Sequence, residues 1–312
     1  STLKKDDNFL FFKIFKSEFK KKTYFNDINN YRFLKKKLNS FKPQIIFHLA
    51  AQSLVIESQR KPFETLETNV IGTNNIIDAC LNLKSVKSLI IATSDKCYLN
   101  KKKSKPFTEN SPLGGVEVYS SSKSICEQMI NMYLFKLKKE INFGLSSVRA
   151  GNVIGGGDFS KYRIIPDIIR NFKSKKIFLR NPRHVRPWQQ VLDVCYGYLL
   201  IPIFHYKNSK KYSGPYNIGP QENKFINVLN LSKLFCKSIG INYKISIIKK
   251  KFIESRLLLL NSKKIKKSLN WFPLYNFKKS LSITSFWYKN YLLKNNIKNI
   301  TISQIKEYFS YR

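Results

Sequence analysis

The sequence predicts an α/β protein with a doubly wound parallel sheet, and three observations support that prediction. The chain has 312 residues, of which 43% are hydrophobic and 14% aromatic, which is enough for a sizeable core. Short apolar runs of strand length occur at 44–49, 88–93 and 143–148. Segments with helical periodicity separate these runs, and buried strands that alternate with helices are typical of a parallel sheet covered on both faces.

The predicted elements follow in order along the chain. Gln44–Leu49 is an apolar run that follows a Lys-Pro pair, which predicts a buried strand. Val70–Leu83 has the spacing of a helix, and Ser88–Thr93 is the second apolar run. Ser121–Lys138 predicts a long amphipathic helix, and Phe143–Val148 predicts a third strand.

After Gly155 the pattern changes to shorter elements, with no internal repeat. We therefore expect two regions. The first, 1–154, carries most of the sheet, and the second, 155–312, is smaller and is built on the first. Some segments of the second region are expected to return to the sheet.

The charge of the chain is strongly positive. There are 57 Lys and Arg against 19 Asp and Glu, a formal net charge of +38, which alone would suggest a nucleic-acid partner or an anionic surface. Only ten of these residues are Arg, and Lys is enriched together with Asn, Ile, Phe and Tyr, all of which have A/T-rich codons. Genome composition therefore explains the charge at least as well. With no nucleic-acid-reading motif present, a basic nucleic-acid-binding protein is a distant alternative.

Cysteine, histidine and the apolar runs exclude several other classes. Five Cys without a CxxC pair and only three His predict neither a disulfide framework nor a metal site. The longest apolar stretches, such as 198–204, are far shorter than the roughly 20 residues of a membrane helix. We expect a cytoplasmic protein without a membrane partner, although a chain that begins at Ser1 says nothing of its own targeting.

Arginine and glycine are concentrated in one part of the chain. Six of the ten Arg lie between 149 and 186, and five of the twelve Gly lie between 144 and 157. In a chain that otherwise uses Lys, Arg indicates positions where a planar guanidinium is needed, as for phosphate. The glycines indicate a loop that turns sharply or approaches a ligand closely.

Tyr119 and Lys123 lie four residues apart, on one face of the predicted helix. A nearby ammonium favours the phenolate, so we expect the Tyr119 pKa to fall from about 10 towards neutrality, which would make it a general base. Such pairs are common by chance, and an ordinary exposed helix face is the alternative.

Two predicted strands end in residues suited to ligand binding. Thr93–Lys96 (TSDK) follows one strand at its carboxyl end, where ligands bind in open parallel sheets. His48–Gln52 follows another, with small residues that would let a flat cofactor lie close. For His48 itself the preferred interpretation is a hydrogen-bonded core histidine. Asn69 could be an ordinary helix N-cap.

Five segments occur in an order that resembles the extended short-chain dehydrogenase/reductase superfamily: LAAQ (49–52), TNVIGT (68–73), TSDKCY (93–98), YSSSK (119–123) and RAGNVIGG (149–156). A narrower resemblance, to the CDP-glucose 4,6-dehydratase family, rests on seven segments: 93–98, 109–115, 119–123, 149–158, 163–170, 180–192 and 260–271. It extends over nearly the whole chain. It implies a Rossmann-like sheet, NAD as cofactor, CDP-glucose as the nucleotide-sugar substrate, a homo-oligomer, and a place in deoxysugar biosynthesis such as that of lipopolysaccharide O-antigen.

The resemblance implies a redox-neutral elimination. Tyr119 takes the proton of the sugar 4-OH while the C4 hydride moves to NAD+; water then leaves across C5–C6, and the hydride returns to C6. Asp95 would be the acid at the 6-OH, and Ser94 would hydrogen-bond the 4-oxygen. Lys96 would be the base at C5, where sister dehydratases normally carry a carboxylate. The alternative for Lys96 is a solvated surface lysine.

The resemblance also implies two sets of binding residues and no metal. For the cofactor they are Ala50, Ala51, Gln52, Asn69, Thr93, Tyr119 and Lys123. For the substrate they are Asn152, Arg163, Asn181, Arg186 and Gln190. Gln190 stands where the family is expected to have His, Arg149 and Arg180 could instead be structural ion-pair residues, and Tyr216–Gly219 is expected to pack in the core.

One departure concerns the cofactor. The family begins with a strand, a GxGxxG turn and a helix, whereas the first glycine here is Gly72. Asp27-Ile28 resembles a family strand end, and Asn8–Phe15 resembles the segment before it. We therefore expect a fragment, or a chain completed by another polypeptide, with an exposed apolar sheet edge beside 44–49 and weak NAD binding.

Two alternatives to an active dehydratase stay open. One is a truncated, inactive paralogue. The other is a nucleotide-sugar epimerase, which would share Tyr119 and Lys123 but has no need of an acid and a base for elimination.

Overall fold

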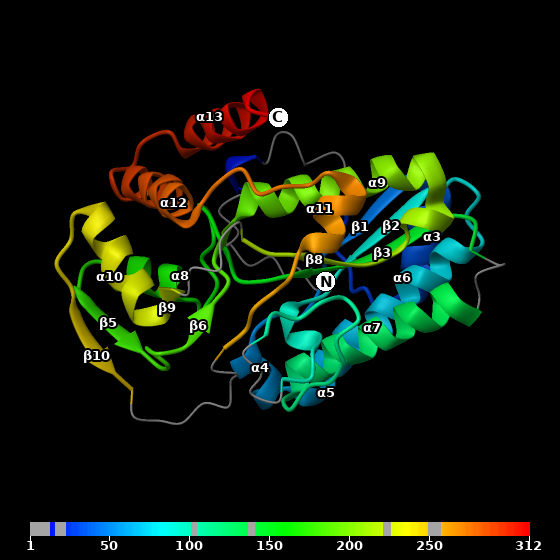
Figure 1. Ribbon diagram of the computed structural model, residues 1–312, viewed down its shortest axis with the longest axis horizontal. Coiled ribbons are helices and arrows are strands. Elements are labelled where there is room, and N and C mark those ends of the chain that lie inside the picture. The colour runs from blue at the N-terminus through cyan, green and yellow to red at the C-terminus, as the bar shows by residue number, and fades with distance from the viewer. Residues whose placement is uncertain (1–12, 16–22, 101–104, 137–140, 221–225, 249–256) are drawn as a thin grey trace.

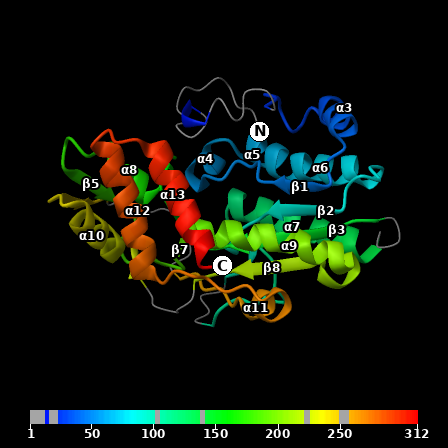
Figure 2. The ribbon, with the colours of Figure 1, turned by 90° about the horizontal axis from the view of Figure 1, so that it is seen from above.

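The computed structural model describes residues 13–15, 23–100, 105–136, 141–220, 226–248 and 257–312 (Figure 1). Its main sheet has the strand order β1-β2-β3-β8, and every pair in it is parallel. Figure 2 shows β1 at one edge of this sheet and β8 at the other. The four strands are β1 (Ile45–His48), β2 (Ser88–Ala92), β3 (Gly144–Ala150) and β8 (Gly214–Ile218). The predicted α/β class with a parallel sheet is confirmed.

Helices cover both faces of this sheet, with α6 and α7 on one side and α9 on the other (Figure 1). The helices of the sheet region are α3 (Tyr31–Phe41), α4 (Val55–Arg60), α5 (Pro62–Leu66), the π-helical turn η2 (Glu67–Ile71), α6 (Gly72–Leu81), the 3-10 turn η3 (Asp95–Cys97), α7 (Val118–Lys136), α9 (Val191–Tyr212) and α11 (Lys263–Leu269). Two predicted boundaries were wrong: helical residues begin upstream of 70 and end at Leu81, and α7 begins before Ser121. Lys138 lies outside the described residues.

The side chains of β2 show why this sheet needs two layers of helices. Leu89 and Ile91 pack into one apolar cluster with side chains of α6 and α7. Ile90, between them, packs into a second cluster with residues of α9 and α11. Successive side chains of a strand point to opposite faces, so a continuous apolar run must be buried on both.

The second region lies beside the sheet (Figure 1) and has an apolar cluster of its own. It contains the remaining elements: β4 (Val153–Ile154), α8 (Ile164–Arg170), β5 (Lys176–Leu179), β6 (Val185–Arg186), β7 (Gln189–Gln190), β9 (Ile226–Asn227), α10 (Val228–Ile239), β10 (Lys244–Ile247), α12 (Phe277–Leu292) and α13 (Ile297–Ser310). Gly156 lies so close to Trp287 of α12 that an added Cβ would be 2.1 Å from the indole. Two later elements belong to the sheet region, since β8 pairs in the sheet and α9 packs against it; the division into two regions at 154/155 stays a prediction.

Tyr216–Gly219 lies in and just after β8. Tyr216 and Ile218 are 1% and 0% exposed, as expected for packing residues. Asn217 does more than pack, because its side chain accepts from Tyr98 Oη (2.6 Å) and donates to the Phe107 carbonyl (2.9 Å).

The edge strand β1 exposes apolar side chains. Within the described residues it pairs only with β2, and Ile45 and Phe47 are 40% and 38% exposed. Leu49, just beyond the strand, is 62% exposed. The exposed apolar edge expected beside 44–49 is therefore present in the described part of the chain.

The strand end expected at Asp27-Ile28 is wrong. These residues belong to a turn in which an Asp27 carboxylate oxygen accepts from the Asn29 amide (2.9 Å). Asn30 then caps α3 by accepting from the Phe33 amide (3.1 Å). Short polar side chains that bond the backbone two or three residues on favour turns and helix starts over strands. Of the segment Asn8–Phe15, residues 8–12 lie outside the described residues.

A buried ion pair joins α7 to the sheet. Arg149 Nη2 lies 2.6 Å from Glu127 Oε2, and the two side chains are 1% and 0% exposed. Glu127 also accepts from the hydroxyls of Ser147 (2.8 Å) and Thr93, and Arg149 donates to Tyr98 Oη (2.8 Å). Arg149 therefore has the structural role that was one of its two alternatives.

None of the helices described is long and apolar enough to cross a membrane.

We predict that Arg149→Met lowers the free energy of unfolding by about 3–5 kcal/mol, because it leaves the Glu127 carboxylate buried without its partner. Denaturation in urea measures the change. Lys279→Met is the control, since Lys279 pairs with Glu307 at 3.2 Å on the surface and its loss should cost less than about 1 kcal/mol. Equal losses of unfolding free energy in the two variants would show that the buried pair contributes no more to stability than a surface pair.

Candidate active site

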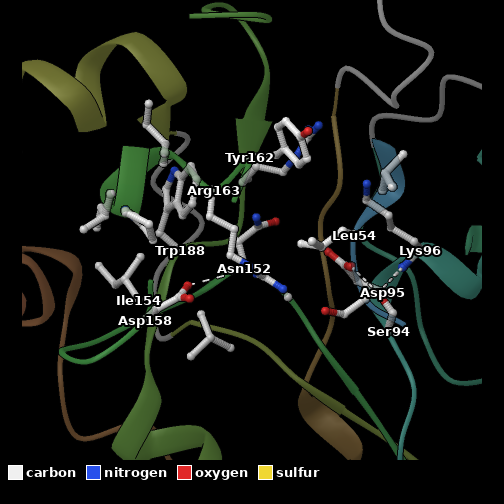
Figure 3. A pocket seen from close by; sticks show the side chains of 18 of the residues that line it. Leu54, Ser94, Asp95, Lys96, Asn152, Ile154, Asp158, Tyr162, Arg163 and Trp188 are labelled. Carbon is white, nitrogen blue, oxygen red and sulfur yellow. Dashed lines mark hydrogen bonds and ion pairs between the residues drawn. The ribbon is translucent and has the colours of Figure 1, made fainter. Parts of the chain in front are cut away.

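A cavity of about 420 Å³ opens at the carboxyl ends of β1, β2 and β3. One wall comes from the sheet side and includes Ala51, the residues from Ala92 to Lys96, and Tyr119. The opposite wall comes from the second region. Figure 3 shows Ser94, Asp95 and Lys96 on one side and Asp158, Arg163 and Trp188 on the other. The parallel topology therefore places the predicted ligand site where strand ends converge.

Asp95 is the most unusual carboxyl group of the cavity. It is 4% exposed, and Ser94 Oγ donates to its Oδ1 (3.1 Å), while its Oδ2 has no hydrogen-bond partner among the described residues. Burial raises the pKa of the Asp95 carboxyl, although the charges of Lys96 and Arg186 act in the opposite direction. A carboxyl in this setting retains its proton to a higher pH than usual, which suits a proton donor.

Tyr119 lies beside Ser94 and is 8% exposed. Burial raises the pKa of Tyr119 to about 12; its hydrogen bond with Ser94 lowers it, and the Asp95 charge raises it further. Lys123, 4% exposed, donates from Nζ to the Ala92 carbonyl (3.0 Å), and burial lowers its pKa. The expectation that Lys123 brings the Tyr119 pKa towards neutrality is therefore wrong here. Helical spacing places both on one face, but burial disfavours both charged forms.

Glu117 holds the start of α7, although the sequence analysis did not single it out. Its carboxylate oxygens accept from the backbone amides of Tyr119 (2.8 Å) and Ser120 (3.0 Å). An acidic side chain just before a predicted helix is the signal that could have identified it, since helix N-termini favour negative charge. Its effect is to fix the backbone that carries the Tyr119 phenol.

Asn69 is not a helix N-cap. It is fully buried within η2, where its side chain accepts from the Gln52 amide (2.8 Å) and donates to the Gln52 carbonyl (3.0 Å) and to Ser122 Oγ (2.9 Å). It thereby clamps the loop after β1 to α7. Of the residues expected near the cofactor, Ala51 lines the cavity, as do Thr93, Tyr119 and Lys123, whereas Ala50, Gln52 and Asn69 are not among the lining residues.

His48 is a buried core histidine, as preferred from the sequence. Its Nε2 lies 2.9 Å from Thr73 Oγ1, and burial, with a smaller effect of the Lys123 charge, lowers its pKa to about 3. The ring is therefore neutral, and it connects β1 to α6.

The opposite wall carries four of the five residues expected to bind substrate: Asn152, Arg163, Asn181 and Arg186. Arg186 is only 4% exposed and donates from Nη1 to the Val185 carbonyl (2.8 Å). Arg163 Nε lies 3.9 Å from an Asp158 carboxylate oxygen, and this pair is partly exposed. Arg180 also lines the cavity and donates from Nη2 to the Tyr162 carbonyl.

Gln190 has a different role from the one expected. It is 2% exposed, is not among the residues that line the cavity, and its side-chain oxygen accepts from the Leu192 amide as the N-cap of α9. Its side-chain oxygen is therefore used to cap α9, whereas the expected role was substrate binding. In the described parts of the chain, no group of three or more His, Cys, Asp or Glu could hold a metal ion.

Comparisons with known proteins point to one family. The family model described as GDP-mannose 4,6 dehydratase matches residues 13–284. A CDP-glucose 4,6-dehydratase of Salmonella typhimurium is 32% identical over 295 residues, which is 92% of this chain and 82% of that protein. A UDP-glucose 4-epimerase of Mycoplasma pneumoniae is 24% identical and covers 80% of this chain and 77% of its own.

Two solved structures share the fold. A UDP-glucose 4-epimerase from Thermotoga maritima, solved with UDP-glucose, has a TM-score of 0.75 at 22% identity and covers 86% of this chain and 84% of its own. A dTDP-glucose 4,6-dehydratase from Bacillus anthracis, solved in complex with NAD, has a TM-score of 0.70 at 24% identity and covers 85% of this chain and 79% of its own.

We predict that Asp95 gives the stability of the protein a pH dependence that Asp95→Asn removes. Because the pKa is raised on folding, the stabilising contribution of the protonated carboxyl is present below about pH 4 and is lost as the pH rises through the folded pKa. The free energy of unfolding of Asp95→Asn, relative to the parent, should therefore increase above about pH 4 and then level off. Urea unfolding at a series of pH values measures it, and a difference that does not vary with pH would contradict the shifted pKa.

Proposed function

Because the chain belongs to the GDP-mannose 4,6-dehydratase family of nucleotide-sugar 4,6-dehydratases, we propose that it is a hydro-lyase that converts CDP-glucose to CDP-4-keto-6-deoxyglucose with NAD as cofactor. The observation that carries this proposal is the pair Asp95-Lys96 at the end of β2. It places a buried, proton-retaining carboxyl and an amine in one wall of the cavity, next to Tyr119. An elimination needs both an acid and a base, whereas a 4-epimerisation needs neither at C5 and C6.

The residues at the ends of β1 and β2 fit one end of a dinucleotide. Ala51, Thr93, Tyr119 and Lys123 line the cavity there, and the small side chain of Ala51 leaves room for a flat ring. When bound, oxidised NAD supplies a hydride acceptor and a positive charge. Support for NAD comes from family membership and from this wall. It does not come from a glycine-rich turn, because the first glycine of this sequence is Gly72.

Tyr119 is proposed to remove the proton of the sugar 4-OH. With a pKa of about 12 its phenol is protonated at neutral pH, so it becomes an effective base only when positive charge enters the cavity. Lys123 is held on the Ala92 carbonyl one helical turn away, on the same face of α7 as Tyr119. In the structure Ser94 donates to Asp95 and lies beside Tyr119. A sugar 4-oxygen bound at Tyr119 would therefore lie within hydrogen-bond reach of Ser94.

Asp95 and Lys96 are proposed to perform the elimination. Once C4 is a ketone, the C5 proton is acidic, and the Lys96 amine accepts it. Asp95 gives its proton to the leaving 6-oxygen, so the elements of water depart from C5 and C6. The raised pKa of Asp95 supports this division, because the group must hold a proton before this step.

The opposite wall is proposed to bind the nucleotide diphosphate. Arg186 is buried there with its guanidinium close enough to Asp95 to influence its pKa, and Arg163, Asn152 and Asn181 line the same wall. The proposed substrate would then extend from these residues to Tyr119 and Lys96. We also propose that the enzyme is a cytoplasmic homo-oligomer in a deoxysugar pathway, such as that of O-antigen.

Tyr119→Phe and Lys96→Met should separate the two halves of the reaction. In the full polypeptide that the gene encodes, given NAD and CDP-glucose, Tyr119→Phe should stop every step, including reduction of NAD. Lys96→Met, which keeps a similar length but has no basic nitrogen, should still oxidise C4 but lose about 10²- to 10⁴-fold in elimination. It should therefore accumulate NADH absorbance and lose deuterium exchange at C5.

The outcomes discriminate between functions. Product formation by Lys96→Met at the parental rate would make Lys96 a bystander. A parental enzyme that gives a 4-epimer in place of the 4-keto-6-deoxy sugar would replace the dehydratase by an epimerase. If neither variant changes the reaction, the dehydratase assignment is wrong.

Arg186→Lys should weaken CDP binding by about 1–3 kcal/mol, because Lys retains the charge but loses the two-pronged geometry that matches a phosphate. Calorimetry with CDP measures this without turnover. Arg32→Lys is the control, since Arg32 is exposed on α3 and does not line the cavity. Unchanged CDP affinity in Arg186→Lys would leave Arg186 with a structural role only.

A further inference from the structure

Tyr162 connects the two walls of the cavity. It lies between Gly155 and α8, in the second region, and it lines the cavity (Figure 3). Arg60, the last residue of α4 on the sheet side, donates from Nη1 to the Tyr162 hydroxyl (3.0 Å). Its guanidinium carbon lies 5.8 Å from the centre of the Tyr162 ring.

A second arginine holds the same tyrosine from its own region. Arg180 donates from Nη2 to the Tyr162 carbonyl, and its guanidinium carbon lies 5.6 Å from the ring centre. Tyr162 is therefore bonded through its backbone to one wall and through its hydroxyl to the other.

The backbone of Tyr162 is in a left-handed conformation, with φ of +63°. Bulky side chains rarely adopt it, and it persists where surrounding contacts hold the residue in place. The next residue is Arg163, one of the proposed diphosphate ligands, so the turn at Tyr162 sets the direction in which Arg163 enters the cavity.

We propose that Tyr162 is a positioning residue that ties the loop before α8 to α4 and thereby holds Arg163 in place and slows the release of the nucleotide sugar. The ligand in this statement rests on the proposed function; the tie itself does not. The Arg60 side chain is 62% exposed and Tyr162 lines the cavity, so the bond joins the two walls on their solvent side.

Loss of this bond should not unfold the protein, because exposed hydrogen bonds and ion pairs contribute little to global stability. Its effect should be local. This separates a positioning role from a merely structural one, since thermal unfolding should stay unchanged while the loop and the bound ligand respond.

Hydrogen exchange in the ligand-free protein tests the tie directly. Amides of 159–163 should exchange about threefold faster or more in Tyr162→Phe, which keeps the ring but loses the hydroxyl, and in Arg60→Gln. Arg60→Lys retains a donor and should recover part of the protection. Lys61→Gln is the control, because Lys61 is the exposed neighbour of Arg60 and pairs with Glu64 at 2.7 Å. Parental exchange rates in Tyr162→Phe and Arg60→Gln would overturn the proposal.

Release of CDP tests the consequence. In stopped-flow measurements, Tyr162→Phe and Arg60→Gln should raise the dissociation rate about three- to tenfold, with Lys61→Gln at the parental rate. An unchanged dissociation rate together with faster hydrogen exchange would show that the bond holds the loop but does not slow the release of CDP, which overturns that part of the proposal. If the parental protein does not bind CDP at all, the proposed substrate fails, and the exchange experiment still decides whether Tyr162 ties the two walls.

Discussion

The buried ion pair between Glu127 and Arg149 is the constraint on which the geometry of the site depends. Glu127 follows Lys123 by one helical turn on α7, so the position of its carboxylate fixes how far α7 can slide along the sheet. The same carboxylate accepts from Thr93, the residue directly before Ser94. One buried charge therefore sets the position of the helix that carries Tyr119 relative to the strand end that carries Asp95, although it touches neither.

Burial then acts in one direction on three ionisable groups of the sheet-side wall, Asp95, Tyr119 and Lys123. It raises the pKa of Asp95 and Tyr119 and lowers that of Lys123, so each is shifted towards its neutral form. For the proposed acid this is the useful state. For Tyr119, the proposed base at the 4-OH, the neutral form is the wrong one, because a protonated phenol accepts no proton. A neutral Asp95 therefore suits the proposed acid step, whereas the proposed base step at Tyr119 depends on positive charge brought in with the ligands.

Local pattern was sufficient to predict the strands at 44–49 and 88–93 and the position of the site, because apolar runs and parallel strand ends are properties of short segments. What could not be predicted depends on partners distant in sequence. Spacing places Tyr119 near Lys123, but only the fold shows that Lys123 is bound to the Ala92 carbonyl. Asn69 looks like a helix cap until its partner Gln52 is known, and Tyr162 has no signal in the sequence at all.

The fold by itself does not decide between dehydration and epimerisation, since solved structures of both kinds of enzyme superpose on this chain with TM-scores of 0.70 to 0.75. The decision lies in how the end of β2 is built. A buried carboxyl with one oxygen lacking a partner in the described structure is costly, and such a cost persists where the group is used. In an epimerase Asp95 would have no leaving group to protonate. In the proposed elimination the unpartnered oxygen is where the departing 6-hydroxyl would bind, so the feature that is costly for folding is one that the proposed reaction would use.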